Sequence, residues 1–255
     1  MNVLAAVAHP DDIEFMMAGT LLALREAGCR IHFWNLANGS CGTQSYSREE
    51  IIALREAEAA ESAKLAGAIY HPPLFEDLGV FYDAPSLAKV AAVVREVAPD
   101  LILTHSPNDY MEDHEAVCRL VCMAAFSRGM TNFRSEPPQP VIGKPVRIYH
   151  ALPHGLRDGL GRKVEADRYV EITPHLEKKA ALLACHRTQK EWLDASQGMG
   201  AYLEEMQRLS AAMGEMSGSF TYAEAFRMHN HLGYCAPEFD PLVALLGART
   251  VSGAS

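Results

Sequence analysis

A short apolar strand that runs directly into a cluster of charged side chains constrains this chain more than any other feature. Residues 3–8 are continuously apolar, which is typical of a strand covered on both faces of a sheet, and His9-Pro10-Asp11-Asp12 follow at once. The run 21–27 then has helical spacing and ends before Gly28, a residue that favours helix termination. The chain therefore opens with a strand, a tight polar turn and a helix.

The next segments repeat this order and predict a parallel sheet. Residues 30–37 form a second strand, and residues 100–105 form another buried strand that ends in a polar loop. Between them, a capping box at residues 47–50 opens a helix that runs to about Gly67, and residues 86–98 have a second helical pattern. Because helix-length crossovers join parallel strands in right-handed units, we expect an α/β fold that is Rossmann-like, with three αβα layers and a mostly parallel sheet.

The second half of the chain is less regular. A helix is expected over 113–127, followed by a proline-rich loop around residues 137–145. Residues 147–152 and 168–172 are strand candidates, and Thr173-Pro174 opens a helix that is predicted to continue to about Lys190.

The organisation along the chain shows no linker, repeat or low-complexity tract. We predict one domain over residues 1–255, with a core over about 1–190 and a more helical C-terminal extension over about 191–255. The small and polar tail from residue 247 onward is expected to fray.

Charge and cysteine usage restrict the partners. The 255 residues contain 23 Lys and Arg against 32 Asp and Glu, for a net charge near −9, which argues against nucleic acid or an anionic membrane as the main partner. A neutral or cationic small molecule fits better. The six cysteines are scattered, and residues 1–8 lack the basic segment of a signal peptide, so we expect free thiols and a cytoplasmic location.

The polar turn after the first strand is the first candidate for chemistry. In open α/β sheets the ligand lies beyond the carboxyl ends of the strands, where His9, Asp11 and Asp12 fall. The chain has no glycine-rich dinucleotide fingerprint at this turn and no phosphate-binding P-loop motif elsewhere. An imidazole with two carboxylates repels phosphate but suits a divalent cation.

A metal site at this turn needs ligands from a second strand end. His9 and Asp12 can point at one centre, while Asp11 between them remains free to handle protons. The loop after residue 104 offers His105 and His114, of which His114 is the preferred third ligand. Two histidines and one carboxylate leave an open coordination position, as in catalytic sites, and nitrogen and oxygen ligands suit Zn²⁺.

Several motifs together resemble one family. Ala8-His9-Pro10-Asp11-Asp12 with Ala18-Gly19-Thr20-Leu21 is similar to the signature of the PIG-L/LmbE family of zinc-dependent N-acetylglucosaminyl deacetylases. The resemblance covers roughly residues 1–190 and includes three further segments: Arg55 to Glu58, Thr104 to Tyr110 with Asp113-His114, and His186 to Gln189. It implies that His9, Asp12 and His114 bind zinc and that Asp11 is the general base.

The second motif departs from the family pattern. Met111-Glu112-Asp113-His114 stands where many members have His-Pro-Asp-His, so the histidine that would act as an acid is replaced by Met111. His186 is our first candidate to supply a proton or an oxyanion contact, with His229 and His231 behind it and re-protonated Asp11 as the fallback.

Other residues receive secondary roles. Tyr110 is a second candidate donor to the oxyanion, and Asp113 either orients His114 or caps the helix that begins there, with capping favoured. Arg55 either contacts substrate, as the resemblance suggests, or forms a surface salt bridge with Glu58. The cysteine pair four residues apart, Cys118 and Cys122, could bind metal in principle but is assigned to the helix core.

These observations predict a zinc-dependent hydrolase. It would remove an acetyl or other small acyl group from the nitrogen of an amino sugar or related amine, with a metal-activated water and Asp11 as the base. Fe²⁺ or another divalent ion is an alternative metal. Two alternatives remain: an impaired or non-catalytic metal-binding homologue, prompted by Met111, and a non-haem Fe(II) enzyme that uses the same ligand set. The sequence does not identify the exact substrate. It also leaves the oligomeric state open, and a homo-oligomer is one possibility.

Overall fold

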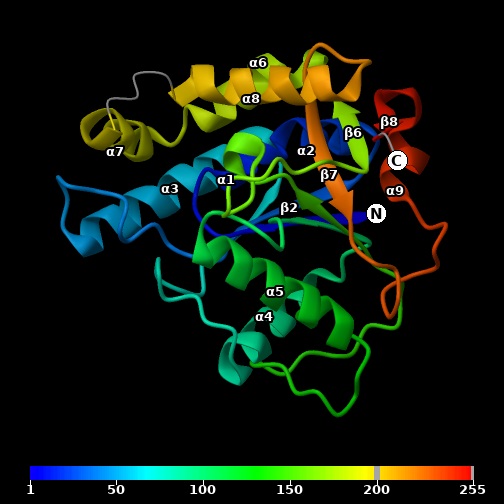
Figure 1. Ribbon diagram of the computed structural model, residues 1–255. Helices are drawn as coiled ribbons and strands as arrows, with labels where there is room; N and C mark the ends of the chain where they lie inside the picture. The colour runs from blue at the N-terminus through cyan, green and yellow to red at the C-terminus, as the bar shows by residue number, and fades with distance from the viewer. Residues whose placement is uncertain (198–201, 254–255) are drawn as a thin grey trace.

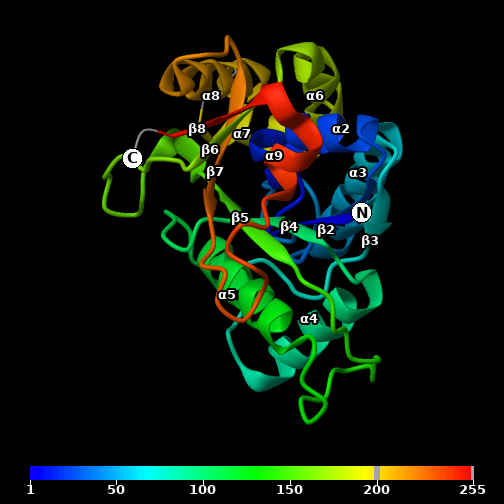
Figure 2. The same cartoon turned by 90° about the vertical axis from the view of Figure 1, so that its right-hand side faces the viewer.

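The computed structural model describes residues 1–197 and 202–253, and it arranges them around one eight-stranded sheet (Figures 1 and 2). The strand order is β3-β2-β1-β4-β5-β7-β6-β8. The first five strands in this order are parallel, whereas β7, β6 and β8 each run antiparallel to their neighbour. In chain order the strands are β1 (Asn2–Val7), β2 (Arg30–Asn35), β3 (Ile69–His71), β4 (Leu101–Thr104), β5 (Arg147–Ala151), β6 (Arg168–Glu171), β7 (Ala223–Met228) and β8 (Thr250–Ser252).

Helices cover both faces of this sheet. The α-helices are α1 (Asp12–Met16), α2 (Ala18–Glu26), α3 (Arg48–Ala66), α4 (Ala84–Val97), α5 (Glu112–Ser127), α6 (Leu176–Leu183), α7 (Arg187–Gln197), α8 (Tyr202–Ser217) and α9 (Pro241–Leu246). Short 3₁₀ turns lie at His154–Leu156, Thr173–His175 and Gly247–Arg249. One face carries α4 and α5, and the other carries α2, α3, α6 and α8 (Figures 1 and 2). Each face has its own hydrophobic cluster, so the predicted three-layer α/β fold is confirmed.

The differences from the sequence expectations lie in the second half and at the sheet edges. The helix expected from Thr173 to Lys190 is interrupted, because α6 ends at Leu183 and α7 begins only at Arg187. The prediction that the tail frays is wrong for residues 250–252, which form β8 and pair with β6. Residues 198–201 of the predicted C-terminal extension and the last two tail residues lie outside the described part of the chain.

Besides β8, two further strands, β3 and β7, were not anticipated. β3 has only three residues, all of them partly exposed, so it lacks an apolar signal. β7 carries a glutamate, Glu224, within an otherwise buried run, and a buried charge breaks the pattern by which strands are recognised. No helix of the described residues is long and apolar enough to cross a membrane.

The buried Glu224 side chain ties the beginning of the fold to its end. Its two carboxylate oxygens accept hydrogen bonds from the backbone N–H groups of Gly19, at 2.9 Å, and Thr20, at 2.7 Å, in the first turn of α2. Lys179 of α6 donates to the same carboxylate at 2.6 Å, and both charged side chains are fully buried. A carboxylate at a helix N-terminus satisfies amides that lack a partner within the helix. Glycine is needed at position 19 because a Cβ atom there would lie 2.6 Å from the Ile172 side chain.

We expect Glu224→Ala to lower the free energy of unfolding by about 3–5 kcal/mol, because it leaves the Lys179 ammonium and two helix amides buried without a partner. Urea denaturation followed by circular dichroism measures this change. The control is Glu26→Ala, which removes an exposed carboxylate paired with Arg249 and 3.6 Å from His175 Nε2, and it should cost no more than about 1 kcal/mol. Equal effects of the two substitutions would contradict the structural role of Glu224.

Candidate functional site

The turn between β1 and α1 places the charged side chains. β1 lies between β2 and β4, so the order of the strands reverses at β1: β2 and β3 lie on one side of it and β4 and β5 on the other. At such a point a crevice forms beyond the carboxyl ends of the strands. The side-chain amide of Asn35, at the end of β2, donates to the carbonyl oxygen of His9 at 2.6 Å, and the N–H of His9 donates to Asp12 Oδ2 at 2.7 Å. Asp11 has a φ of 110°, a left-handed conformation that is strained for a residue other than glycine.

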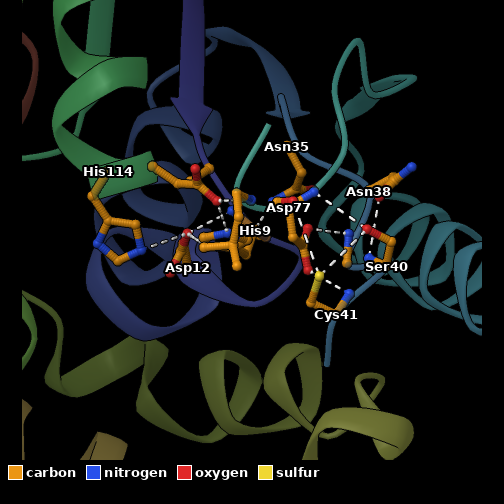
Figure 3. A network of polar contacts seen from close by, with 12 residues as sticks. His9, Asp12, Asn35, Asn38, Ser40, Cys41, Asp77 and His114 are labelled. Carbon is orange, nitrogen blue, oxygen red and sulfur yellow. Dashed lines mark hydrogen bonds and ion pairs between the residues drawn. The ribbon is translucent and has the colours of Figure 1, made fainter. Parts of the chain in front are cut away.

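This turn and the start of α5 together form a candidate metal centre. One ligand atom from each of His9, Asp12 and His114 lies within 4.8 Å of the others. Asp12 Oδ2 is 3.6 Å from His9 Nδ1 and 3.5 Å from His114 Nε2, and Figure 3 shows Asp12 between the two rings. The structure thus brings together the three residues that the sequence assigned to the metal.

Each histidine of this centre is held from behind by a second carboxylate. His9 Nε2 lies 3.0 Å from Asp113 Oδ2, and His114 Nδ1 lies 3.0 Å from Asp109 Oδ1. A ring nitrogen bonded to a carboxylate leaves the opposite nitrogen oriented for a metal, as in many metal sites. The donor set therefore fits a divalent cation.

The expectation for Asp113 is corrected by this geometry. Asp113 neither orients His114 nor caps α5: it accepts from the ring of His9 and from the backbone N–H of Leu78 at 2.7 Å. The residue that precedes the helix is Met111, which makes no side-chain capping bond. Asp109 is the residue that orients His114, and its position five residues before the histidine gave no signal in the sequence.

His105 lies beside the centre and forms, with Asp109 and His114, a second group whose ligand atoms lie within 4.8 Å of one another. Its Nε2 accepts a hydrogen bond from the backbone N–H of Ala8 at 2.8 Å, so this nitrogen is already engaged, whereas His114 belongs to both groups. The same atom is 3.3 Å from Asp12 Oδ2, and its ring stacks on that of His114 with 4.0 Å between centroids. Among the two histidines left open as the third ligand, the structure favours His114.

The protonation of the centre reflects its concentrated negative charge. Burial disfavours the charged form of His9, but hydrogen bonds to Asp113 and Asp12 outweigh burial and raise the pKa of His9 to about 10. Burial also acts against ionised Asp12, yet the adjacent His114 and His105 hold the pKa of that carboxyl well below its usual range. Such a site can exchange a firmly held proton for a divalent cation.

Asp11 is buried next to the centre and faces different partners. The hydroxyl of Tyr202, from α8, donates to Asp11 Oδ2 at 2.6 Å, and an Arg55 nitrogen lies 3.9 Å from Oδ1. Burial raises the pKa of Asp11 to about 6, although the nearby Arg55 guanidinium opposes the rise and Asp12 adds to it. No feature of the sequence pointed to Tyr202, because it belongs to the part of the chain whose pattern was least clear.

Arg55 does not form the surface salt bridge with Glu58 that was one of the two alternatives from the sequence. Its side chain is buried and donates to the carbonyl oxygen of Pro10 at 2.7 Å, whereas Glu58 accepts hydrogen bonds from Thr188. The loop that follows β2 closes over Arg55. A Cβ atom at Gly39 would lie 2.4 Å from the Arg55 side chain, so this position requires glycine.

A cavity of about 450 Å³ opens over the metal centre and Asp11. Its walls include Tyr110, whose ring meets His114 edge-on, and apolar side chains of α1 and α7 such as Phe15 and Trp192. Asp77 also lines it and accepts from the backbone N–H groups of Gly39 and Cys41, which holds the loop after β2 at the cavity (Figure 3).

His154 is a cavity residue that the sequence analysis missed. It follows β5 directly, its ring lies 5.4 Å from Phe15 and 6.3 Å from Tyr110 between centroids, and burial lowers its pKa. The signal existed, because β5 was expected over 147–152 and His154 is the first titratable residue beyond its carboxyl end.

The histidines proposed from the later part of the chain do not line this cavity in the described structure. His186 is buried between α6 and α7, with its Nε2 3.3 Å from Glu14 Oε2, and it acts on Asp11 only through its charge. His229 lies 2.8 Å from His150 behind β5, away from the residues that surround the metal centre. His231 lies in the loop after β7.

The known proteins that this chain resembles include hydratases and a deacetylase. A curated relative, 4-oxalmesaconate hydratase from Pseudomonas putida, is 26% identical over 200 residues, which cover 74% of each chain. Among solved structures, the 4-carboxy-2-hydroxymuconate hydratase of Pseudomonas putida KT2440 has a TM-score of 0.74 at 22% identity, and covers 90% of this chain and 96% of its own. The N,N'-diacetylchitobiose deacetylase of Pyrococcus horikoshii also has a TM-score of 0.74, at 24% identity, with 94% and 88% covered.

The family match lies on the half of the chain that builds the metal centre. Residues 4–125 match PIG-L, described as GlcNAc-PI de-N-acetylase, and this segment contains His9, Asp11, Asp12 and His114. The solved deacetylase shares the fold over nearly the whole chain. The resemblance stated from the sequence motifs is thus confirmed over residues 4–125, and the proteins of similar fold include a deacetylase and a hydratase.

Proposed function

We propose that this protein is a zinc-dependent hydrolase that removes an acetyl or other small acyl group from the nitrogen of an amino sugar or a related amine. One observation carries the proposal: a buried carboxylate, Asp11, stands beside a His9, Asp12 and His114 ligand set without being part of it. When bound there, zinc supplies Lewis-acid chemistry, polarising a carbonyl oxygen and acidifying a water molecule.

Asp11 is suited to be the general base. With a pKa raised to about 6 by burial, it is mostly ionised at neutral pH and still basic enough to accept the proton of the attacking water. The Tyr202 hydroxyl occupies Oδ2 and so fixes the orientation of the carboxylate, which leaves Oδ1 to move protons. After attack, protonated Asp11 can return the proton to the departing amine.

We assign to His154 the proton-donor role that Met111 cannot fill. Burial lowers the pKa of His154, so its neutral ring carries one N–H that can donate to the acyl oxygen as charge develops on it. The phenol of Tyr110, on the same wall, is the second donor. His186 is assigned a positioning role through Glu14 and Asp11 instead of direct contact with substrate.

The charge of the cavity supports a neutral substrate and a cationic product. Of the described lining residues, five are carboxylates (Asp11, Asp12, Asp77, Asp109 and Glu205), while Arg55 is the one guanidinium or ammonium. Arg55 is already bonded to Pro10 and is covered by the loop at Gly39. The aromatic wall with Trp192 suits the apolar face of a sugar ring.

Hydration of an unsaturated acid is the second candidate, because the curated relative and one solved structure are hydratases. Their named substrates are polycarboxylates. Apart from the metal, Arg55 is the one guanidinium or ammonium among the described lining residues that such an anion would meet, and residues 4–125 match the family model of a de-N-acetylase, which is why we rank the deacylase first.

The decisive experiment follows acetate release from N-acetylglucosamine and N,N'-diacetylchitobiose by the zinc-loaded protein, alongside the absorbance of 4-carboxy-2-hydroxymuconate. We expect acetate release by the wild type and a loss of about 10²- to 10⁴-fold in Asp11→Asn, which removes the base. Asp158→Asn, on a surface loop, is the matched control and should be fully active. Hydration without acetate release would overturn the proposal in favour of the hydratase.

The ligand set is tested by zinc affinity. Asp113→Asn weakens the hold on His9, and we expect zinc affinity at this centre to fall about 10- to 100-fold in competition with a chromophoric chelator. Glu112→Gln makes the same chemical change at the neighbouring exposed position and should bind zinc as the wild type does. The assignment fails if the two variants bind zinc equally.

The role of His154 is tested by separating kcat from KM. His154→Ala removes the donor, and we expect kcat to fall about 10²- to 10³-fold with KM and zinc content little changed. His154→Gln keeps an N–H donor and should recover part of the lost rate. A change confined to KM would assign His154 to substrate binding instead.

A further inference from the structure

A second set of metal-binding side chains lies behind the cavity, between α5 and the sheet. We call Cys118, Cys122, His150 and His229 the Cys–His cluster. Cys118 and Cys122 are one turn apart on α5, His150 is on β5, and His229 directly follows β7. Three segments of structure that are far apart in sequence therefore bring together two sulfurs and two imidazoles.

Three residues of the Cys–His cluster lie close enough together to share one ion, and His229 lies beside them. One ligand atom from each of Cys118, Cys122 and His150 lies within 4.8 Å of the others. His229 Nδ1 lies 3.9 Å from Cys122 Sγ and 2.8 Å from His150 Nε2. Cys118 and His150 are almost fully buried.

The hydrogen bond behind His150 prepares it as a ligand. Its Nδ1–H donates to the backbone carbonyl oxygen of His105 at 2.7 Å, and Cys118 Sγ lies 3.5 Å from the same nitrogen. Nε2 then carries the lone pair and faces His229. A ring held in this way by a backbone carbonyl is the arrangement found behind metal-bound histidines.

The geometry points to a second, structural zinc site formed by the Cys–His cluster. Two sulfurs and two nitrogens complete a tetrahedral set for Zn²⁺ and leave no open position, in contrast to the centre over the cavity. The site would fasten α5 to β5 and to the chain that follows β7, where the Tyr234 hydroxyl also donates to the carbonyl oxygen of Cys122 at 3.2 Å (Figure 2).

This second site also has a direct connection to the first. His150 fixes the carbonyl of His105, and the ring of His105 lies 3.3 Å from Asp12 and stacks on His114. His114, Cys118 and Cys122 follow one another at four-residue steps on the same side of α5, so one helix serves both metals.

Metal stoichiometry and cobalt spectroscopy test the proposal. We expect the wild type, purified under reducing conditions with zinc supplied, to hold two zinc ions per chain by elemental analysis. After exchange into Co²⁺, the thiolate ligands should give an intense sulfur-to-cobalt charge-transfer band, which the sulfur-free first centre cannot produce. This readout needs no substrate and does not depend on the proposed function.

Matched variants assign each ion. Cys118→Ser with Cys122→Ser should hold one zinc ion and lose the charge-transfer band, whereas His114→Ala should also hold one but keep the band. Cys29→Ser with Cys185→Ser removes two buried thiols elsewhere and should retain both ions. One zinc ion in the wild type with no charge-transfer band would overturn the proposal, and because this result needs no variant it stands even if a substitution prevents folding.

Discussion

The turn from β1 into α1 is the constraint on which the functional geometry depends. The left-handed backbone at Asp11 lets two successive carboxylates face in different directions, so that Asp12 joins His9 and His114 while Asp11 turns toward Tyr202. A residue with a strained backbone conformation of this kind keeps it only where the surrounding contacts stabilise it. Here the hold comes from Asn35 and from the buried amides of the turn itself.

The first half of the fold could be predicted because its signals are local. β1, β2 and β4 are continuous buried runs, and the helix from Arg48 has a complete capping box with Ser47. The rule that chemistry gathers at the carboxyl ends of parallel strands then led from His9 to His114, which the structure brings together. These conclusions needed only residue order and spacing.

The residues that sequence reasoning missed act across long separations. Tyr202 reaches Asp11 from 191 positions away, and Asp113 supports His9 instead of its own neighbour His114, because packing of α5 decides which ring it meets. His186 was expected on a helix that faces the site, but the break between α6 and α7 leaves it behind Asp11. Spacing cannot report such pairings, since they are set by the docking of whole helices.

The carboxylate of Glu224 affects when, during synthesis of the chain, helix α2 can gain all of its native contacts. Helix α2 emerges early from the ribosome, but the side chain that closes its first turn is made 205 residues after Gly19. Until β7 has been synthesised and has joined the sheet, the amides of that turn and the ammonium of Lys179 lack their native partner. The helix that follows the polar turn thus gains its final support only when nearly the whole chain has been made.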